Sequence, residues 1–125
     1  MEININRDNF TEVNLNKSNF KRVNLIEVDF IKGNLKKSCF EGVNLRGANL
    51  EGANLEDANF REASFKWANL RRVNLQEADL IEANLEKANI DGAHLDGAYL
   101  KGISLKEADL EGACLKGLTY KEPKI

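Results

Sequence analysis

Few side chains in this 125-residue sequence are of the types that perform catalysis or bind metal ions. There is one histidine, His94, and there are two cysteines, Cys39 and Cys114. A metal centre or a nucleophilic triad needs several such groups brought together, and the carboxylates, such as Asp79 and Asp109, lack the paired spacing that suits acid–base chemistry. We therefore expect no catalytic residue, no cofactor, no metal ligand and no enzyme activity.

The overall composition argues against several classes of protein. With 18 basic and 20 acidic residues, the formal net charge is −2, which does not suit a strongly basic nucleic-acid binder. No apolar run approaches the roughly 20 residues of a membrane helix. The N-terminal residues lack the basic and apolar regions of a signal peptide. We therefore expect a cytoplasmic protein that binds neither nucleic acid nor membrane.

The residues follow a strict period of five. Every fifth residue from Ile5 to Tyr120 is large and apolar, and this central position holds all six Phe and 15 of the 16 Leu. All twelve Ala lie two residues before a central position, and Asn or Asp directly precedes 17 of the 24 central residues. Eight of the nine Gly lie two residues after it. Such a period indicates a repeat architecture.

A period of five fits neither a helix nor a straight strand. A helix turns about 100° per residue and would scatter the central residues around its axis, whereas residues five apart in a strand point to opposite faces. A bend in every unit resolves the conflict, with the central residue and the residue two before it both pointing inward. The Gly positions suit the positive φ of a type II turn, and the Asn or Asp positions suit hydrogen bonds to nearby backbone.

Regular bends close the chain into a polygonal coil whose stacked turns satisfy one another's backbone groups. The Phe positions favour four sides, because a 20-residue coil stacks Phe20, Phe40 and Phe60 in one column and Phe10 with Phe30 in another. A three-sided coil places fewer of these rings in adjacent layers. We predict an all-β solenoid of about six coils and a single domain over residues 1–125, with repeats over about 3–120 and a short tail at 121–125.

Units such as Ala-Asn-Leu-Glu-Gly at 48–52 and Ala-Asp-Leu-Ile-Glu at 78–82 resemble the A(D/N)LXX motif of the pentapeptide-repeat family. The resemblance covers nearly the whole chain and implies a right-handed quadrilateral parallel β-helix, in agreement with the four sides. The first coil departs from the motif, since Asp8 stands where a small inward residue is usual. A carboxylate is costly to bury, so we expect that coil to be open to water at Asp8.

The family resemblance also implies one specific function, because its best-known members mimic duplex DNA and bind DNA gyrase and other type II topoisomerases. DNA carries a charge about every 1.7 Å along its axis, so a mimic needs a long column of carboxylates. The outward residues on the four sides have formal charges of +2, −3, 0 and 0, without a continuous acidic stripe. We expect a non-enzymatic structural or protein-interaction scaffold with an unknown protein partner, and DNA mimicry remains the alternative.

Four apolar residues at outward positions form the possible protein-binding surface: Trp67, Ile26, Ile31 and Ile81. Trp67 and Ile26 fall on the same side, two coils apart, and Trp is enriched among residues that dominate binding energy at interfaces. We expect Trp67 to contribute to partner binding.

The histidine and the cysteines all occupy Asn-type positions of the repeat. We expect His94 to be a surface residue without ligating partners in neighbouring units. Cys39 and Cys114 fall on different sides and about four coils apart, far beyond the reach of about 7 Å that a disulfide needs. We therefore expect both thiols to be reduced.

The two ends of a solenoid expose unpaired backbone and apolar side chains, which invite pairing with another chain. Leu118, Tyr120 and Ile125 are available to fold over the last coil, whereas only residues 1–3 are available at the other end. We expect a monomer with short tail caps or a weak end-to-end homodimer.

Overall fold

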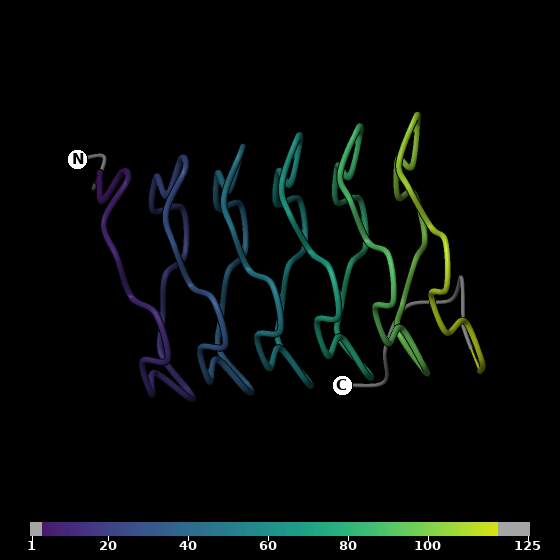
Figure 1. The fold of residues 1–125 in the computed structure, drawn as a ribbon, viewed down its shortest axis with the longest axis horizontal. Helices are drawn as coiled ribbons and strands as arrows, with labels where there is room; N and C mark the ends of the chain where they lie inside the picture. Colours follow the sequence, from purple (N-terminus) through teal and green to yellow (C-terminus); the bar gives the residue numbers. More distant parts are fainter. Residues whose placement is uncertain (1–3, 118–125) are drawn as a thin grey trace.

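In the computed structural model, which describes residues 4–117, the chain winds as one continuous coil along a straight axis (Figure 1). These residues form no helix, and therefore no helix that could cross a membrane. They also form no strand longer than one residue, because each five-residue unit contributes a single β-bridge residue, then the central residue and a two-residue turn. The expected tail cap at residues 118–125 lies outside the described residues.

Parallel bridges join residues that are 20 positions apart, from Asn4 with Asn24 to His94 with Cys114. The bridges form four columns, and the column that begins at Asn14 and ends at Cys114 contains six layers. The central N–H groups from Ile5 to Leu95 donate to the next coil, as from Leu50 to the Asn69 carbonyl at 2.8 Å. The predicted coil of four sides and about six layers is therefore confirmed.

Each corner is a type II turn, as predicted from the Gly positions. At the corner after Leu50, the N–H of Ala53 donates to the Leu50 carbonyl at 2.9 Å, and Gly52 between them has φ of +69°. Among residues 4–117, fifteen residues other than Gly adopt the same left-handed conformation at equivalent corners, Glu77 and Trp67 among them. That conformation costs an L-residue about 1–2 kcal/mol, so the backbone bonds to the neighbouring coils impose the turn even where Gly is absent.

The Asn and Asp residues before the central positions stabilise these turns, as expected. The Asn54 side-chain oxygen accepts the N–H of Glu56 at 3.1 Å, and the Asp79 carboxylate accepts the N–H of Ile81 at 3.1 Å. Each such bond satisfies an N–H group that lies at a bend. The side chain at this position therefore substitutes for a backbone acceptor.

The interior is filled by the two inward positions of each unit. Ala48 and Leu50 are fully buried, like most of their equivalents in the middle coils. The predicted aromatic columns are present: Phe40 stacks between Phe20 and Phe60, with ring centroids 5.0 and 4.7 Å away. Phe10 and Phe30 stack in a second column, at 5.3 Å between ring centroids.

Residues that depart from Ala at the small inward position are accommodated in different ways. Val28 and Val43 are buried. The buried Ser38 hydroxyl donates to the Leu15 carbonyl and accepts the N–H of Ser18, both at 3.0 Å, so it enters the core without an unpaired polar group. Asp8 is exposed, which confirms that the first coil is open to water at this residue.

Candidate interaction surface and metal centre

Trp67 is the most exposed of the four apolar residues expected on a binding surface, with 52% of its area accessible. It stands at a corner with φ of 65°, which directs its indole away from the core. The Lys87 ammonium lies one coil further on, 4.6 Å from the ring centroid, and also pairs with Glu107 at 3.6 Å. A cation at this distance holds the indole by a cation–π contact, so the aromatic face is held in place on the surface.

The other three residues do not form one patch with Trp67. Ile26 lies on the same side and is half-buried, and Ile31 is half-buried on the next side of the coil. The expectation that Ile81 is exposed is wrong, because only 5% of its area is accessible. Its neighbours in the same outward column, one coil below and one above, are Arg61 and Lys101, and long basic side chains can cover apolar surface with their alkyl stems.

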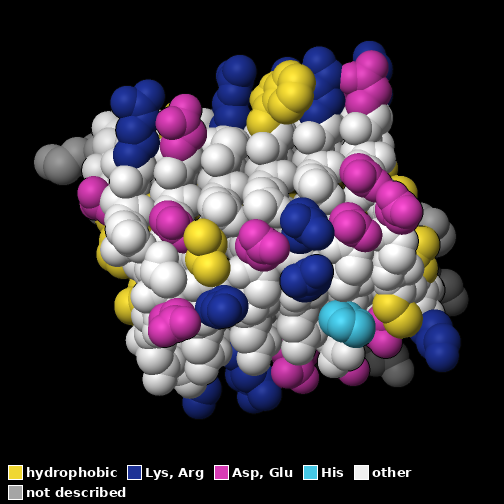
Figure 2. All heavy atoms as spheres, viewed as in Figure 1, with side chains coloured by type: hydrophobic (Ala, Val, Ile, Leu, Met, Phe, Trp, Pro, Cys, Tyr) yellow, Lys and Arg dark blue, Asp and Glu magenta, His cyan; other side chains and the backbone are white. Residues whose placement is uncertain are grey.

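Several outward charges are paired between adjacent coils. Figure 2 shows basic and acidic side chains interspersed on the face in view, with hydrophobic side chains scattered among them. Arg61 pairs with Asp79. The other ion pairs among residues 4–117 join residues 20 apart in one column: Arg7–Glu27, Lys21–Glu41, Lys36–Glu56, Lys66–Glu86, Lys87–Glu107, and Arg71 with both Glu51 and Asp91. Basic and acidic residues are therefore neighbours at several places in these columns.

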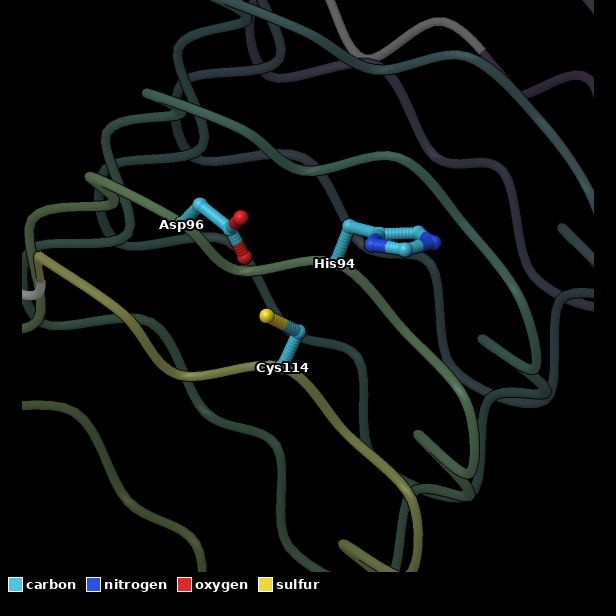
Figure 3. Close-up of side chains that lie close together, drawn as sticks. All are labelled: His94, Asp96 and Cys114. Atoms are coloured by element: carbon cyan, nitrogen blue, oxygen red, sulfur yellow. The ribbon is translucent and has the colours of Figure 1, made fainter.

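His94, Asp96 and Cys114 form a cluster of potential metal ligands on one side of the coil. One potential ligand atom from each residue lies within 4.8 Å of the other two. In Figure 3 the Asp96 carboxylate and the Cys114 sulfur point toward one another, whereas the His94 ring extends away from them with one nitrogen on the near side. The cluster thus brings together a nitrogen, an oxygen and a sulfur donor.

The backbone of the repeat determines where these three side chains begin. His94 and Cys114 are paired in a β-bridge, and the Cys114 N–H donates to the Ala93 carbonyl at 2.8 Å. Asp96 follows two residues after His94 and is held by its carbonyl, which accepts the N–H of Glu77 at 2.9 Å. All three residues therefore start from a backbone fixed by bonds between coils.

Asp96 is unusual among the described acidic residues. Its Oδ1 atom is buried and has no hydrogen-bond partner, and it is the one such side-chain atom among residues 4–117. Lys116 follows it by 20 residues in the same column, the spacing of the ion pairs above, yet no ion pair joins them. A buried carboxylate oxygen without a donor or cation is energetically costly. A hydrogen-bond donor or a cation at this atom would remove that cost.

Sequence reasoning missed this cluster because it treated His94 in isolation. The signal that could have revealed it is the separation of His94 and Cys114 by 20 residues, one full coil, which places both in the same column. The two cysteines are free thiols in different columns, as expected. No pocket opens among the described residues.

Comparisons with known proteins identify the repeat. The family model "Pentapeptide repeats" matches eight copies at residues 9–42, 38–76 and 83–117. The crystal structure of the pentapeptide repeat protein Rfr23, from the cyanobacterium Cyanothece 51142, is 30% identical with a TM-score of 0.61, over 94% of this chain and 91% of Rfr23. Comparison with curated protein sequences gave no match.

A second solved structure is that of HetL, a pentapeptide repeat protein involved in heterocyst differentiation regulation in the cyanobacterium Nostoc sp. strain PCC 7120. It is 27% identical with a TM-score of 0.51, and the match covers 92% of this chain and 62% of HetL. The fold is the right-handed quadrilateral β-helix of these proteins. Since the family model covers most of its length, the chain belongs to the pentapeptide-repeat family.

Proposed function

We propose that this protein is a non-enzymatic interaction scaffold that presents outward side chains of a rigid coil to a protein partner. The observation that carries the proposal is the exposure of Trp67 at a corner, where its ring packs with Lys87. Buried aromatic anchors dominate many interfaces, and a Trp that is held in place before binding loses little conformational freedom. HetL, at 27% identity, is described as involved in regulation of differentiation, which fits a protein that acts through a partner.

The distribution of charge supports a protein partner rather than a mimic of duplex DNA. The columns of outward residues contain ion pairs between Lys or Arg and Glu or Asp in adjacent coils, as in Arg71 between Glu51 and Asp91. Each pair interrupts the run of negative charge that a DNA mimic needs along its axis. A surface of this kind offers local hydrogen-bonding and apolar contacts instead of a uniform field.

The test compares Trp67→Ala with a matched control, Arg72→Ala. Arg72 occupies the equivalent corner on the next side of the coil and has the same left-handed conformation. Affinity purification from the source, with quantitative mass spectrometry, should yield partners that the Trp67 variant loses and the Arg72 variant keeps. Both variants should unfold within about 0.5 kcal/mol of the parent protein, as surface substitutions usually do. Identical partners for all three proteins would exclude Trp67 as the anchor.

We further propose that the scaffold acts in a reducing compartment such as the cytoplasm and is a monomer or a weak end-to-end homodimer. Two free thiols support the first statement. End-to-end pairing is supported by the first coil, because its large inward residues, Ile5 and Phe10 among them, are only partly buried. Light scattering over a wide concentration range would distinguish the two states, and a constant monomer mass at the highest concentration would reject the dimer.

A further inference from the structure

We propose that His94, Asp96 and Cys114 bind a divalent zinc ion. A His nitrogen, a carboxylate oxygen and a Cys thiolate are the three donor types that zinc takes in proteins. Three protein ligands leave the fourth tetrahedral position to water or to a donor from a partner. The thiolate favours zinc over calcium and magnesium, which prefer oxygen ligands.

The geometry needs only side-chain adjustment to accept the ion. At bond lengths of about 2.0–2.3 Å, the nitrogen, oxygen and sulfur ligands of a tetrahedral zinc ion lie about 3.3–3.7 Å apart. The three potential ligand atoms already lie within 4.8 Å of one another. The backbone at His94 and Cys114 is fixed by their bridge, so rotation about the side-chain bonds brings the atoms together without a change in the coil. Ligands positioned in this way by rigid backbone are well suited to metal binding.

The unpaired oxygen of Asp96 is an independent indication of a cation at this place. Its Oδ1 atom is buried without a donor, and Figure 3 shows its carboxylate directed toward the space between His94 and Cys114. Lys116, one coil further on in the same column, makes no ion pair with it, although seven ion pairs within the described part of the chain have that spacing. A metal ion bound by His94 and Cys114 would neutralise this carboxylate.

The two residues also depart from the repeat at adjacent layers of one column. Directly before them in that column, Asn74 accepts the N–H of Gln76 at 3.0 Å and stabilises its turn. His94 and Cys114 replace the Asn of the next two layers and forgo its amide oxygen. Departures from a local structural rule are expected where function requires them, and here both substituted residues have side chains of types that bind zinc.

The experiment titrates the reduced protein with Zn²⁺ by calorimetry and with Co²⁺ as an optical probe of tetrahedral thiolate coordination. The variants His94→Asn and Cys114→Asn restore the usual residue of the repeat, so the coil should remain intact, which circular dichroism would verify. Asp96→Asn removes the carboxylate charge. The matched control is Cys39→Asn, which removes a thiol from the same repeat position in a different column.

The parent protein and the Cys39 variant should each bind one equivalent of metal, and Zn²⁺ should raise their melting temperatures. Each of the three ligand variants should bind at least about tenfold more weakly, and Cys114→Asn should abolish the absorption from cobalt–thiolate charge transfer. The proposal is overturned if the parent protein binds neither ion at about 0.1 mM. It is equally overturned if the His94 and Cys114 variants bind as tightly as the parent.

Discussion

His94 and Cys114 are paired by a parallel β-bridge, so their side chains leave the same side of the coil in adjacent layers. Asp96 stands two residues after His94, and its carboxylate completes the cluster. The repeat thus places residues that are distant in sequence side by side wherever their numbers differ by 20. Stacked Phe rings in the core, corner residues and most surface ion pairs are likewise neighbours at a spacing of 20. A single substitution can therefore test the contribution of each kind of contact to stability or binding.

The aromatic column should make a large contribution to stability. Phe40 is fully buried between Phe20 and Phe60. Replacing it with Ala should lower the free energy of unfolding by about 3–5 kcal/mol, because the cavity forms in a densely packed interior. Phe40→Leu should cost about 1–1.5 kcal/mol, which reflects lost ring stacking. Urea unfolding monitored by circular dichroism measures both, and a Leu variant as unstable as the Ala variant would contradict this order.

The left-handed corners should respond to substitution in opposite directions. Gly52 and Arg72 are neighbours in one corner column, with φ of +69° and 56°. Gly52→Ala should destabilise the protein by about 1–2 kcal/mol, since an L-residue is strained there and its Cβ would lie 3.4 Å from the Lys32 Cγ. Arg72→Gly should stabilise it by up to about 1 kcal/mol. Thermal unfolding of both variants checks the signs, and a stabilising Ala at position 52 would refute the argument.

The Asn side chains before the central positions should be replaceable by Asp but not by Ala. The Asn54 oxygen accepts the N–H of Glu56 at 3.1 Å, and Asp29 and Asp79 make the same bond in other units. Asn54→Ala should therefore cost about 1 kcal/mol of stability, whereas Asn54→Asp should be nearly neutral. Chemical denaturation would measure the difference, and equal losses for the two variants would show that the turn bond contributes nothing.

The pairing of surface charges predicts no effect on DNA gyrase. Because basic residues such as Arg71 separate acidic residues of the same column, the coil lacks the continuous negative column that would compete with duplex DNA. A supercoiling assay with about micromolar protein should therefore proceed as it does without the protein, with a known gyrase inhibitor as the positive control. Inhibition that depends on protein concentration would instead favour DNA mimicry.

Most of the fold could be predicted because the period of five specifies both the bend and the inward positions. Leu50 and Ala48 are buried where the pattern places them, and the Phe columns give the number of sides. The left-handed corners at charged residues such as Glu77 could not be inferred from residue type, because the backbone bonds between coils impose them.

The surface was less predictable, because the period indicates whether a residue points inward or outward but not how far neighbouring side chains cover it. Ile81 points outward and is nevertheless buried, since long side chains in adjacent layers can cover it. The cluster of His94, Asp96 and Cys114 could be predicted in part, because the 20-residue spacing of His94 and Cys114 is visible in the sequence. The orientation and burial of the Asp96 carboxylate depend on its packing, which no period encodes.

A closed turn of 20 residues also means that a place on the surface is defined by residue number modulo 20. Inserting one five-residue unit between His94 and Cys114 would leave each unit able to fold, yet it would rotate everything beyond the insertion by a quarter of a revolution. Cys114 would then leave the side occupied by His94, whereas an insertion of four units would keep the column and lengthen the axis by one coil. Duplication and loss of units can therefore rearrange the surface while the core stays the same.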